Sequence, residues 1–253
     1  MRTQTLVKKI KEKKELSSLA DQLIIDTLNN YLKKHNLSLE KVSDPDSKII
    51  VKEVRAKLRV FSGRYQKSLK DRKKFLNDNS LQELLKTHSS TAERLEFYPT
   101  LKKIIKELKV NSILDLGCGL NPIALASPEI KYNASDIKQD ELSLIKLFFK
   151  KNQIKGNVFI YDLKRIKEDL PKSDLCLLFK VLDILEEKEH KIAEEIIKKT
   201  PCKKILVSFA TKKLSGKPMS QPRRFWFEKM LTRLNLKFEK FSSRNEIFYL
   251  IEK

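Results

Sequence analysis

The sequence is poor in the residues that build tight turns, disulfides and metal sites. Its 253 residues include five glycines, three cysteines and three histidines. The cysteines, Cys118, Cys176 and Cys202, are odd in number and lack a CxxC spacing. This argues against a disulfide framework and a zinc site, and it predicts reduced thiols in a cytosol. We therefore expect a cytoplasmic protein without a bound metal.

Long apolar runs are also absent. No stretch of about 18 consecutive apolar residues occurs, so we expect no membrane span. The first residues, MRTQTLVKKIKEKK, have no apolar core followed by a cleavage site and do not resemble a secretory signal. An apolar content of 40% and a charged content of 34% predict a soluble globular protein.

Acidic residues are fewer than basic ones. The chain has 54 Lys and Arg against 33 Asp and Glu, a net charge of +21. Such an excess attracts polyanions and favours nucleic acid as a partner, whereas surface lysines without a partner are the alternative. An anionic membrane is disfavoured because no basic helix carries bulky aromatics on its other face. Residues 1–109 hold 26 basic against 14 acidic residues and the remainder 28 against 19, so the first part is the more basic.

The hydrophobic pattern changes near residue 110. Residues 1–109 have apolar residues at helical spacing, as in LSSLADQLIIDTLNNYLKKH. After them, short apolar runs such as SILDLG and KKILVSFA alternate with helical stretches, which predicts a parallel sheet covered on both faces. LKFEKF and EIFYLIEK predict a closing antiparallel hairpin. We expect a basic helical domain over 1–109 and an α/β domain over 110–253.

Two of the scarce glycines lie together in ILDLGCGLNPIAL, directly after an apolar run. Gly117 and Gly119 allow a sharp turn and a close approach of the backbone to a ligand. The dinucleotide fingerprint GxGxxG is incomplete, because Pro122 occupies its third glycine position. Asp115 completes a DxGxG pattern, which suits a cofactor with a cationic amino-acid end better than a pyrophosphate.

Acidic residues also end the next two expected strands. Asp136 is placed to accept hydrogen bonds from ribose hydroxyls, and Asp162 from an adenine amino group. Three acids at successive strand ends, joined to the glycine loop, predict a site for S-adenosylmethionine (SAM). The alternative for each acid alone is that it caps the following helix.

The motifs together resemble one family. HSSTAERL, ILDLGCGLNPIAL, SDIKQ, LLFKVLDILE, LVSFATKKLSG, WFE and EIFYLI stand in the same order in the Arm/Rmt (FmrO-type) aminoglycoside-resistance 16S rRNA methyltransferases. The resemblance covers roughly residues 85–252, and GCGLNP with HSSTAERL is far more specific than a generic glycine loop.

The resemblance implies a class I SAM-dependent methyltransferase fold, Rossmann-like, with an N-terminal helical extension that docks on rRNA. It implies transfer of methyl to N7 of a decoding-site guanine of 16S rRNA within the 30S subunit, and resistance to aminoglycosides. We expect a monomer. The resemblance suggests that Arg94 contacts the SAM carboxylate and that His88 packs beside the pocket. The full expected cofactor set is His88, Arg94, Asp115, Gly117, Gly119, Asp136, Ile137, Asp162, Leu163 and Phe179.

Two residues after the fourth expected strand are candidates for the chemistry. Asp183 is placed to stabilise positive charge on the purine, and Lys180 to hold a phosphate or a base edge. A helix cap and a solvated lysine are the respective alternatives. Cations expected to contact RNA are Arg55, Arg59, Arg64, Lys67, Lys212, Arg223 and Arg224.

Two other functions remain open on the sequence. One is methylation of another RNA position, such as adenine N1 or a tRNA nucleotide. The other is a SAM-binding ribosome-assembly factor that docks without catalysis. Retention of Asp115, Gly117, Asp136 and Asp162 together favours an active cofactor site.

Overall fold

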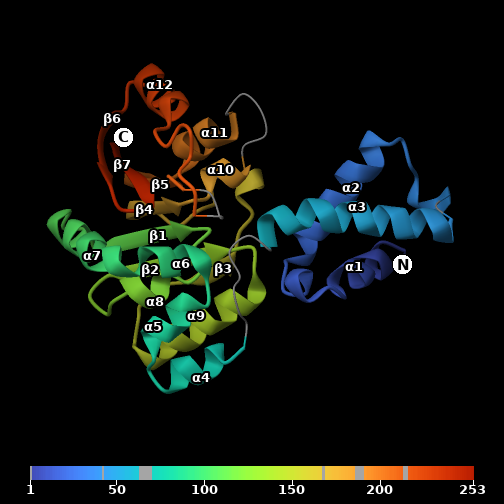
Figure 1. Ribbon diagram of the computed structural model, residues 1–253, viewed down its shortest axis with the longest axis horizontal. Coiled ribbons are helices and arrows are strands. Elements are labelled where there is room, and N and C mark those ends of the chain that lie inside the picture. The colour runs from blue at the N-terminus through green and yellow to red at the C-terminus, as the bar shows by residue number, and fades with distance from the viewer. Residues whose placement is uncertain (1, 42, 63–69, 167–168, 186–190, 213–215) are drawn as a thin grey trace. The chain divides into compact units, whose positions relative to one another are not determined.

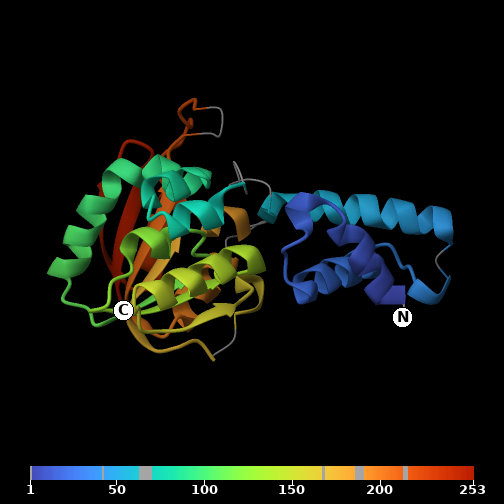
Figure 2. The same cartoon turned by 90° about the horizontal axis from the view of Figure 1, so that it is seen from below.

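The computed structural model describes residues 2–41, 43–62, 70–166, 169–185, 191–212 and 216–253. The chain divides into two compact units. The first comprises Met1–Gln66 together with Ile137–Asp140, and the second comprises Lys67–Asp136 and Glu141–Lys253. Each has a hydrophobic core of its own, and Figures 1 and 2 show the elements of both.

The first unit is helical. Its elements are α1 (Arg2–Lys11), the short 3-10 turn η1 (Lys14–Leu16), α2 (Asp21–Lys34), η2 (Leu39–Lys41) and α3 (Asp44–Ser62). The apolar stripes of α1, α2 and α3 close on one another, with Ile10, Ile24 and Val54 fully buried. The helical periodicity of the sequence is confirmed here, and burial of each stripe stabilises helices that would be marginal alone.

The second unit is built on a seven-stranded sheet. Its strands are β1 (Ser112–Leu116), β2 (Lys131–Asp136), β3 (Val158–Ile160), β4 (Ser173–Phe179), β5 (Cys202–Ala210), β6 (Lys237–Ser242) and β7 (Glu246–Glu252). The order is β3-β2-β1-β4-β5-β7-β6. Strands β1 to β5 are parallel, and β7 runs antiparallel to both β5 and β6. The predicted parallel sheet and closing hairpin are confirmed.

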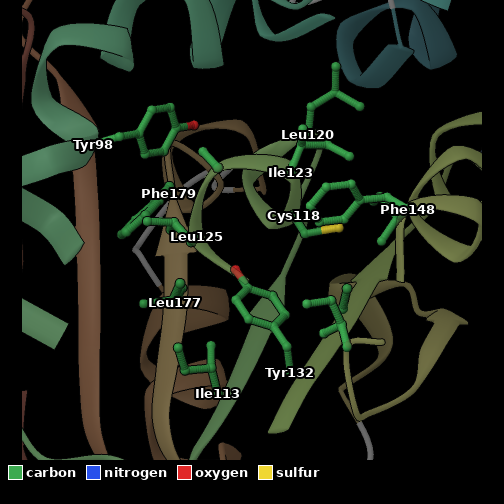
Figure 3. Packing of buried hydrophobic residues seen from close by; sticks show 14 of the residues in the cluster. Tyr98, Ile113, Cys118, Leu120, Ile123, Leu125, Tyr132, Phe148, Leu177 and Phe179 are labelled. Carbon is green, nitrogen blue, oxygen red and sulfur yellow. The ribbon is translucent and has the colours of Figure 1, made fainter. Parts of the chain in front are cut away.

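Helices cover both faces of this sheet. They are α4 (Arg72–Asn77), α5 (Leu81–Lys86), α6 (Ser89–Arg94), η3 (Leu95–Phe97), α7 (Tyr98–Glu107), α8 (Asn121–Leu125), α9 (Gln139–Lys151), η4 (Leu163–Arg165), α10 (Leu182–Leu185), α11 (Lys191–Lys199) and α12 (Phe225–Arg233). Helices α5, α7, α8 and α9 bury their apolar residues against one face. In Figure 3, side chains from β1, β2 and β4 point toward those of α7, α8 and α9. On the other face, Phe227 of α12 contacts Phe209 and Tyr249, with ring centroids 5.0 and 5.3 Å away.

The division between the units differs from the expected one at residue 109, because α4 to α7 pack on the sheet. Leu84 and Leu101 are fully buried in the core of the second unit. The guanidinium of Arg72 also donates to Thr87 at 2.8 Å and pairs with Glu141 of α9 at 3.4 Å. Helical periodicity marks these segments as helices but does not say which core their apolar faces cover.

The hydrophobic core of the second unit yields a stability prediction. Leu206 lies in β5 and is fully buried, whereas Leu147 on α9 is 49% exposed. We expect Leu206→Ala to lower the free energy of unfolding by about 2–5 kcal/mol, because the deletion removes buried contacts and leaves a cavity. Leu147→Ala should change it by no more than about 0.5 kcal/mol. Urea unfolding followed by circular dichroism measures both, and equal losses would contradict this assignment of the core.

Candidate functional site

The glycine loop lies at the point where the strand order reverses. Strand β1 has β2 on one side and β4 on the other, and the chain leaves its carboxyl end through Gly117 and Gly119. Ligands of open α/β sheets bind in the crevice at such a position. Gly117 and Gly119 have φ of +68° and +50°, which side chains rarely adopt. A Cβ on Gly117 would lie 2.7 Å from Cγ2 of Val181.

Asp136, at the end of β2, is joined to this loop. Its Oδ2 accepts a hydrogen bond from the backbone N–H of Gly119 at 2.9 Å. The imidazole of His88 packs on the same glycine, 3.1 Å from the position that a Cβ would take. His88 and Asp136 thus both contact the glycine turn at Gly119, and their role in a cofactor pocket stays a prediction.

Asp115 lies inside β1 and is fully buried. The hydroxyl of Tyr132 donates to its Oδ2 at 2.7 Å. Burial raises the pKa of Asp115 to about 7, because removal from water disfavours the charged carboxylate. Besides Tyr132, the side chain of Asn121 favours the charged form of this carboxyl, and its Oδ1 is buried. A buried carboxylate beside a glycine turn fits the ammonium group of an amino-acid ligand.

Arg94, at the end of α6, is fully buried and donates to protein acceptors from all three guanidinium nitrogens. Nε and Nη2 donate to Oε2 of Glu246 at 3.2 and 2.8 Å. Nη1 donates to Oδ1 of Asn121 at 2.7 Å, and Nη2 also to Ser90 at 3.2 Å. Burial disfavours the guanidinium cation, but the Glu246 carboxylate keeps the pKa of Arg94 above its ordinary value. The carboxylate partner of Arg94 in this structure is therefore Glu246, and the contact of Arg94 with a SAM carboxylate stays a prediction.

Glu246, the first residue of β7, belongs to this buried cluster and was not among the residues predicted from the sequence. Besides Arg94, it accepts from the hydroxyl of Ser208 at 2.7 Å and pairs with Nζ of Lys180 at 3.3 Å. Burial opposes its ionisation, yet Arg94 and Lys180 hold the pKa of the Glu246 carboxyl below its ordinary value. Within EIFYLI this residue reads as the polar start of a strand. Its position opposite Ala210, at the end of β5, follows only from the strand register of the structure, so no local signal in the sequence marked it.

Lys180 and Asp183 follow β4, as predicted, and both form ion pairs with other side chains of the protein. Nζ of Lys180 binds the carboxylates of Glu93 and Glu246, and its backbone has a φ of +56°. Asp183 lies in the first turn of α10 and pairs with Nη2 of Arg224 at 2.7 Å. The roles predicted for them in the chemistry stay predictions.

The remaining cofactor candidates lie near the same edge of the sheet. Phe179 ends β4 with the Arg94 guanidinium 4.7 Å over its ring. Oδ1 of Asp162 accepts from the backbone N–H of Lys164 at 3.0 Å, so this acid caps η4, as the alternative interpretation had it. Leu163 is buried in η4. Ile137 directly follows Asp136 in the chain and contacts the core of the first unit.

The residues predicted to contact RNA differ in burial and in their partners. Arg224 is buried and donates to Asp183 and to the backbone carbonyls of Ala210, Gln221 and Pro222, which does not fit a surface contact. Arg223 pairs with Glu228 on α12. Its guanidinium lies 4.5 Å over the ring of the exposed Phe225.

On α3, Arg55 donates to the carbonyl of Ile10 and pairs with Glu12, while Arg59 is 48% exposed and pairs with Glu15. Lys212 is half-buried and forms an isolated β-bridge with Pro218. Arg64 and Lys67 lie outside the described residues.

A family model described as ribosomal RNA methyltransferase (FmrO) matches residues 77–250. The chain belongs to this family. A Serratia marcescens 16S rRNA (guanine(1405)-N(7))-methyltransferase is 30% identical over 211 residues, which cover 80% of this chain and 83% of that enzyme. The enzyme of the same name from Micromonospora rosea is 30% identical over 67% of this chain. The chain spans 64% of the length of the Micromonospora rosea relative and 66% of that from Micromonospora echinospora.

Solved structures agree in fold. The 16S rRNA methylase RmtB has a TM-score of 0.80 at 24% identity, covering 100% of this chain and 99% of its own. RmtF, solved with S-adenosyl-L-homocysteine, has a TM-score of 0.83 at 21% identity, covering 100% and 98%. The resemblance to the Arm/Rmt family and the predicted methyltransferase fold are thereby confirmed. Among the described helices of this member, none has the length and hydrophobicity needed to cross a bilayer.

The close contact at Gly117 predicts a local effect of substitution. In Gly117→Ala, the new methyl group meets Val181 while the backbone keeps a φ that alanine avoids. We expect SAM binding to weaken about tenfold or more, since about 1–3 kcal/mol of strain falls on the loop itself. Gly216→Ala is the control, because its Cβ would meet nothing within 4 Å although its φ is also positive, at +80°. Calorimetry that finds equal affinities in both variants would contradict the close fit.

The raised pKa of Asp115 predicts a pH dependence of stability. A carboxyl whose pKa is higher in the folded state binds more protons when folded, so its contribution to stability is full at acidic pH. That contribution is lost as pH rises toward the folded pKa of about 7 and is absent above it. The difference in free energy of unfolding between Asp115→Asn and the wild type should shift in favour of the variant as the pH rises from about 4 to 7. Above about pH 7 this difference should stay constant. Urea midpoints from pH 4 to 8.5 measure it, and a difference independent of pH would refute the assignment.

Proposed function

We propose that the protein transfers a methyl group from SAM to N7 of a decoding-site guanine of 16S rRNA in the 30S subunit. The observation that carries this proposal is the buried cluster of Arg94, Asn121, Lys180 and Glu246. These residues come from four separate motifs of the resemblance, STAERL, GCGLNP, LLFK and EIFYLI. The names of the relatives, 16S rRNA (guanine(1405)-N(7))-methyltransferase, support the choice of the N7 atom.

The residues at the ends of β1, β2 and β4 suit SAM, which supplies an electrophilic methyl group on its sulfonium when bound. The buried carboxylate of Asp115 suits its ammonium group, and the glycine turn allows close approach of the backbone. We assign Asp136 and Ile137 to the ribose and Asp162 with Leu163 to the adenine. Phe179 and His88 complete the walls.

The chemistry needs positioning more than proton transfer. Guanine N7 carries an exposed lone pair and has no proton to remove, so in-line placement of the base supplies most of the rate enhancement. The paired state of Lys180 agrees with this. A lysine held by Glu93 and Glu246 serves to fix the two carboxylates and the end of β4, and a base is not required of it.

The first unit offers a surface for a polyanion. A cleft of about 410 Å³ between α1 and α3 is lined by Glu12 and by six cations, Lys9, Lys13, Lys48, Lys52, Arg55 and Arg59. Phosphate contacts from such a set provide affinity without base specificity. Arg55, bound to the end of α1, shapes this cleft, while Lys48 and Lys52 are exposed. We propose docking on rRNA here, in the cytoplasm and by a monomer, with aminoglycoside resistance as the consequence.

Methyl transfer tests the proposal directly. Full-length protein is incubated with methyl-labelled SAM and 30S subunits, naked 16S rRNA or tRNA, and label is mapped by cleavage at 7-methylguanine. We expect label at one decoding-site guanine of the 30S subunit. We expect Asp136→Ala to lose it and Asp78→Ala, a change at an exposed acid of the second unit, to keep it.

Each other outcome overturns this function. Label in tRNA or at an adenine would assign another RNA position. SAM binding without label in any acceptor would favour an assembly factor that docks without catalysis.

A further inference from the structure

An aromatic side chain of the second unit faces solvent at the start of α12. Phe225 is the first residue of this helix and is 54% exposed. The next residue, Trp226, turns inward, with its ring centroid 5.8 Å from that of Phe209 and 5.4 Å from that of Phe227. A single exposed apolar side chain is ordinary on a protein surface, so the surroundings of Phe225 decide whether it has a function.

The start of α12 is fixed at the carboxyl edge of the sheet. Arg224 precedes Phe225 and is buried. Its Nη2 donates to the carbonyl of Ala210 at 3.0 Å and pairs with Asp183 at 2.7 Å. Ala210 ends β5 and Asp183 lies in α10, directly after β4, so both partners belong to the edge where the glycine turn lies. Bonds protected from water in this way hold the backbone of Phe225 at that edge.

The ring of Phe225 has a guanidinium beside it. Cζ of Arg223 lies 4.5 Å from the ring centroid, within the range of a cation–π contact. Nε of Arg223 donates to Oε1 of Glu228 at 2.8 Å, and the hydroxyl of Tyr249 donates to the same oxygen at 3.0 Å. Glu228 thus holds the guanidinium in place. Aromatic rings and guanidinium planes are the two kinds of protein surface on which unpaired RNA bases stack.

A cleft adjoins Phe225. It has a volume of about 450 Å³, lies between α12 and β6, and is lined by Phe225, Glu228, Lys229, Thr232, Arg233 and Phe238. Figure 1 shows α12 beside β6. Sites for small ligands measure about 300–1,000 Å³, so the cleft is large enough for a base. The lining residues are all distinct from the candidate cofactor residues, which places this surface apart from the proposed SAM site.

The charges around the cleft favour a polyanion. The side chains of Arg223 and Arg233 are 45% and 63% exposed, whereas their carboxylate partners Glu228 and Glu194 are 11% and 18% exposed. Lys229 is exposed as well. The cations therefore point to solvent and the carboxylates lie beneath them, which gives the rim of the cleft a positive field. Such a rim suits the phosphates of a nucleic acid better than an apolar protein segment.

We propose that Phe225 and Arg223 form a stacking platform for an unpaired base of the RNA, with Lys229 and Arg233 on the adjoining phosphates. This platform rests on the proposed function and adds a contact to its RNA substrate. Because the cleft is separate from the candidate cofactor residues, the base that stacks here is not the methyl acceptor. The contact tolerates any sequence, since every base has a π face.

Four variants of the full chain separate stacking from other effects. Phe225→Ala removes the ring, Phe225→Leu keeps apolar bulk without a π face, and Phe225→Tyr keeps an aromatic ring. Leu147→Ala is the matched control, because it deletes another exposed apolar side chain of the same unit, on α9. Exposed substitutions rarely unfold a protein, and thermal unfolding verifies that all four variants fold.

The readout is the dissociation constant for 30S subunits and for a single-stranded RNA of about eight nucleotides. We expect Phe225→Ala and Phe225→Leu to weaken both about fivefold or more, and Phe225→Tyr and Leu147→Ala to stay within about twofold of wild type. SAM affinity, measured by calorimetry, should be the same in all variants. In the methylation assay, KM for 30S subunits should rise while kcat is kept.

Fluorescence tests the stacking directly. The chain has one tryptophan, Trp226, which packs inward, so Phe225→Trp adds an indole on the platform. We expect the single-stranded RNA to quench this added emission, and the wild type to show no comparable change. Unchanged emission of Phe225→Trp at RNA concentrations that saturate binding would overturn the platform.

Three further outcomes would overturn the platform and leave the proposed function intact. One is unchanged RNA affinity in Phe225→Ala. Another is full affinity in Phe225→Leu, which would indicate an apolar contact with a protein of the subunit. The third is a dimer of the wild type that Phe225→Ala dissociates, because a second copy would then occupy the cleft. RNA binding that depends on Phe225, without label in any acceptor, would support the platform and overturn the methylation proposal alone.

Discussion

A single buried carboxylate, that of Glu246, holds together the ligand edge of the sheet. It lies between the guanidinium of Arg94 and the ammonium of Lys180, and the three side chains are almost completely shielded from water. An isolated charge in such surroundings costs far more than the pair, so each group requires the other two in place. Because they come from α6, β7 and the end of β4, this requirement fixes three distant parts of the chain together.

The antiparallel strand makes that cluster geometrically attainable. A parallel strand beside β5 would begin at the opposite edge of the sheet, far from the ends of β1 and β4. Strand β7 runs the other way, so its first residue, Glu246, stands opposite Ala210 at the end of β5. The carboxylate thereby reaches the edge where the glycine turn lies. The closing hairpin thus contributes to the site and does more than end the sheet.

The sequence predicted which segments form helices and strands better than it predicted which core or side chain each of them contacts. The apolar run before Gly117 and the alternation after it give local signals that a single segment carries, and the parallel sheet followed from them. The core on which a helix packs, and the groups that surround a charged side chain, depend on residues far away in the sequence. Helix α4 has the same kind of periodicity as α3 but packs on another core, and Arg224 reads as a surface cation although Asp183 and three carbonyls enclose it. Glu246 escaped notice because its role depends on residues up to 152 positions away.

The two units use their charges in opposite ways. In the second unit, Arg94, Lys180 and Arg224 are neutralised by buried or half-buried carboxylates, so they add little to the field outside. In the first unit, the cleft between α1 and α3 sets six cations against one carboxylate at the surface. In the first unit, surface cations therefore gather at a cleft that suits a polyanion, while in the second unit buried ion pairs hold the geometry of the candidate cofactor site. Salt should accordingly weaken the proposed docking strongly and the proposed cofactor binding much less, because screening acts on exposed charges and hardly on buried ones.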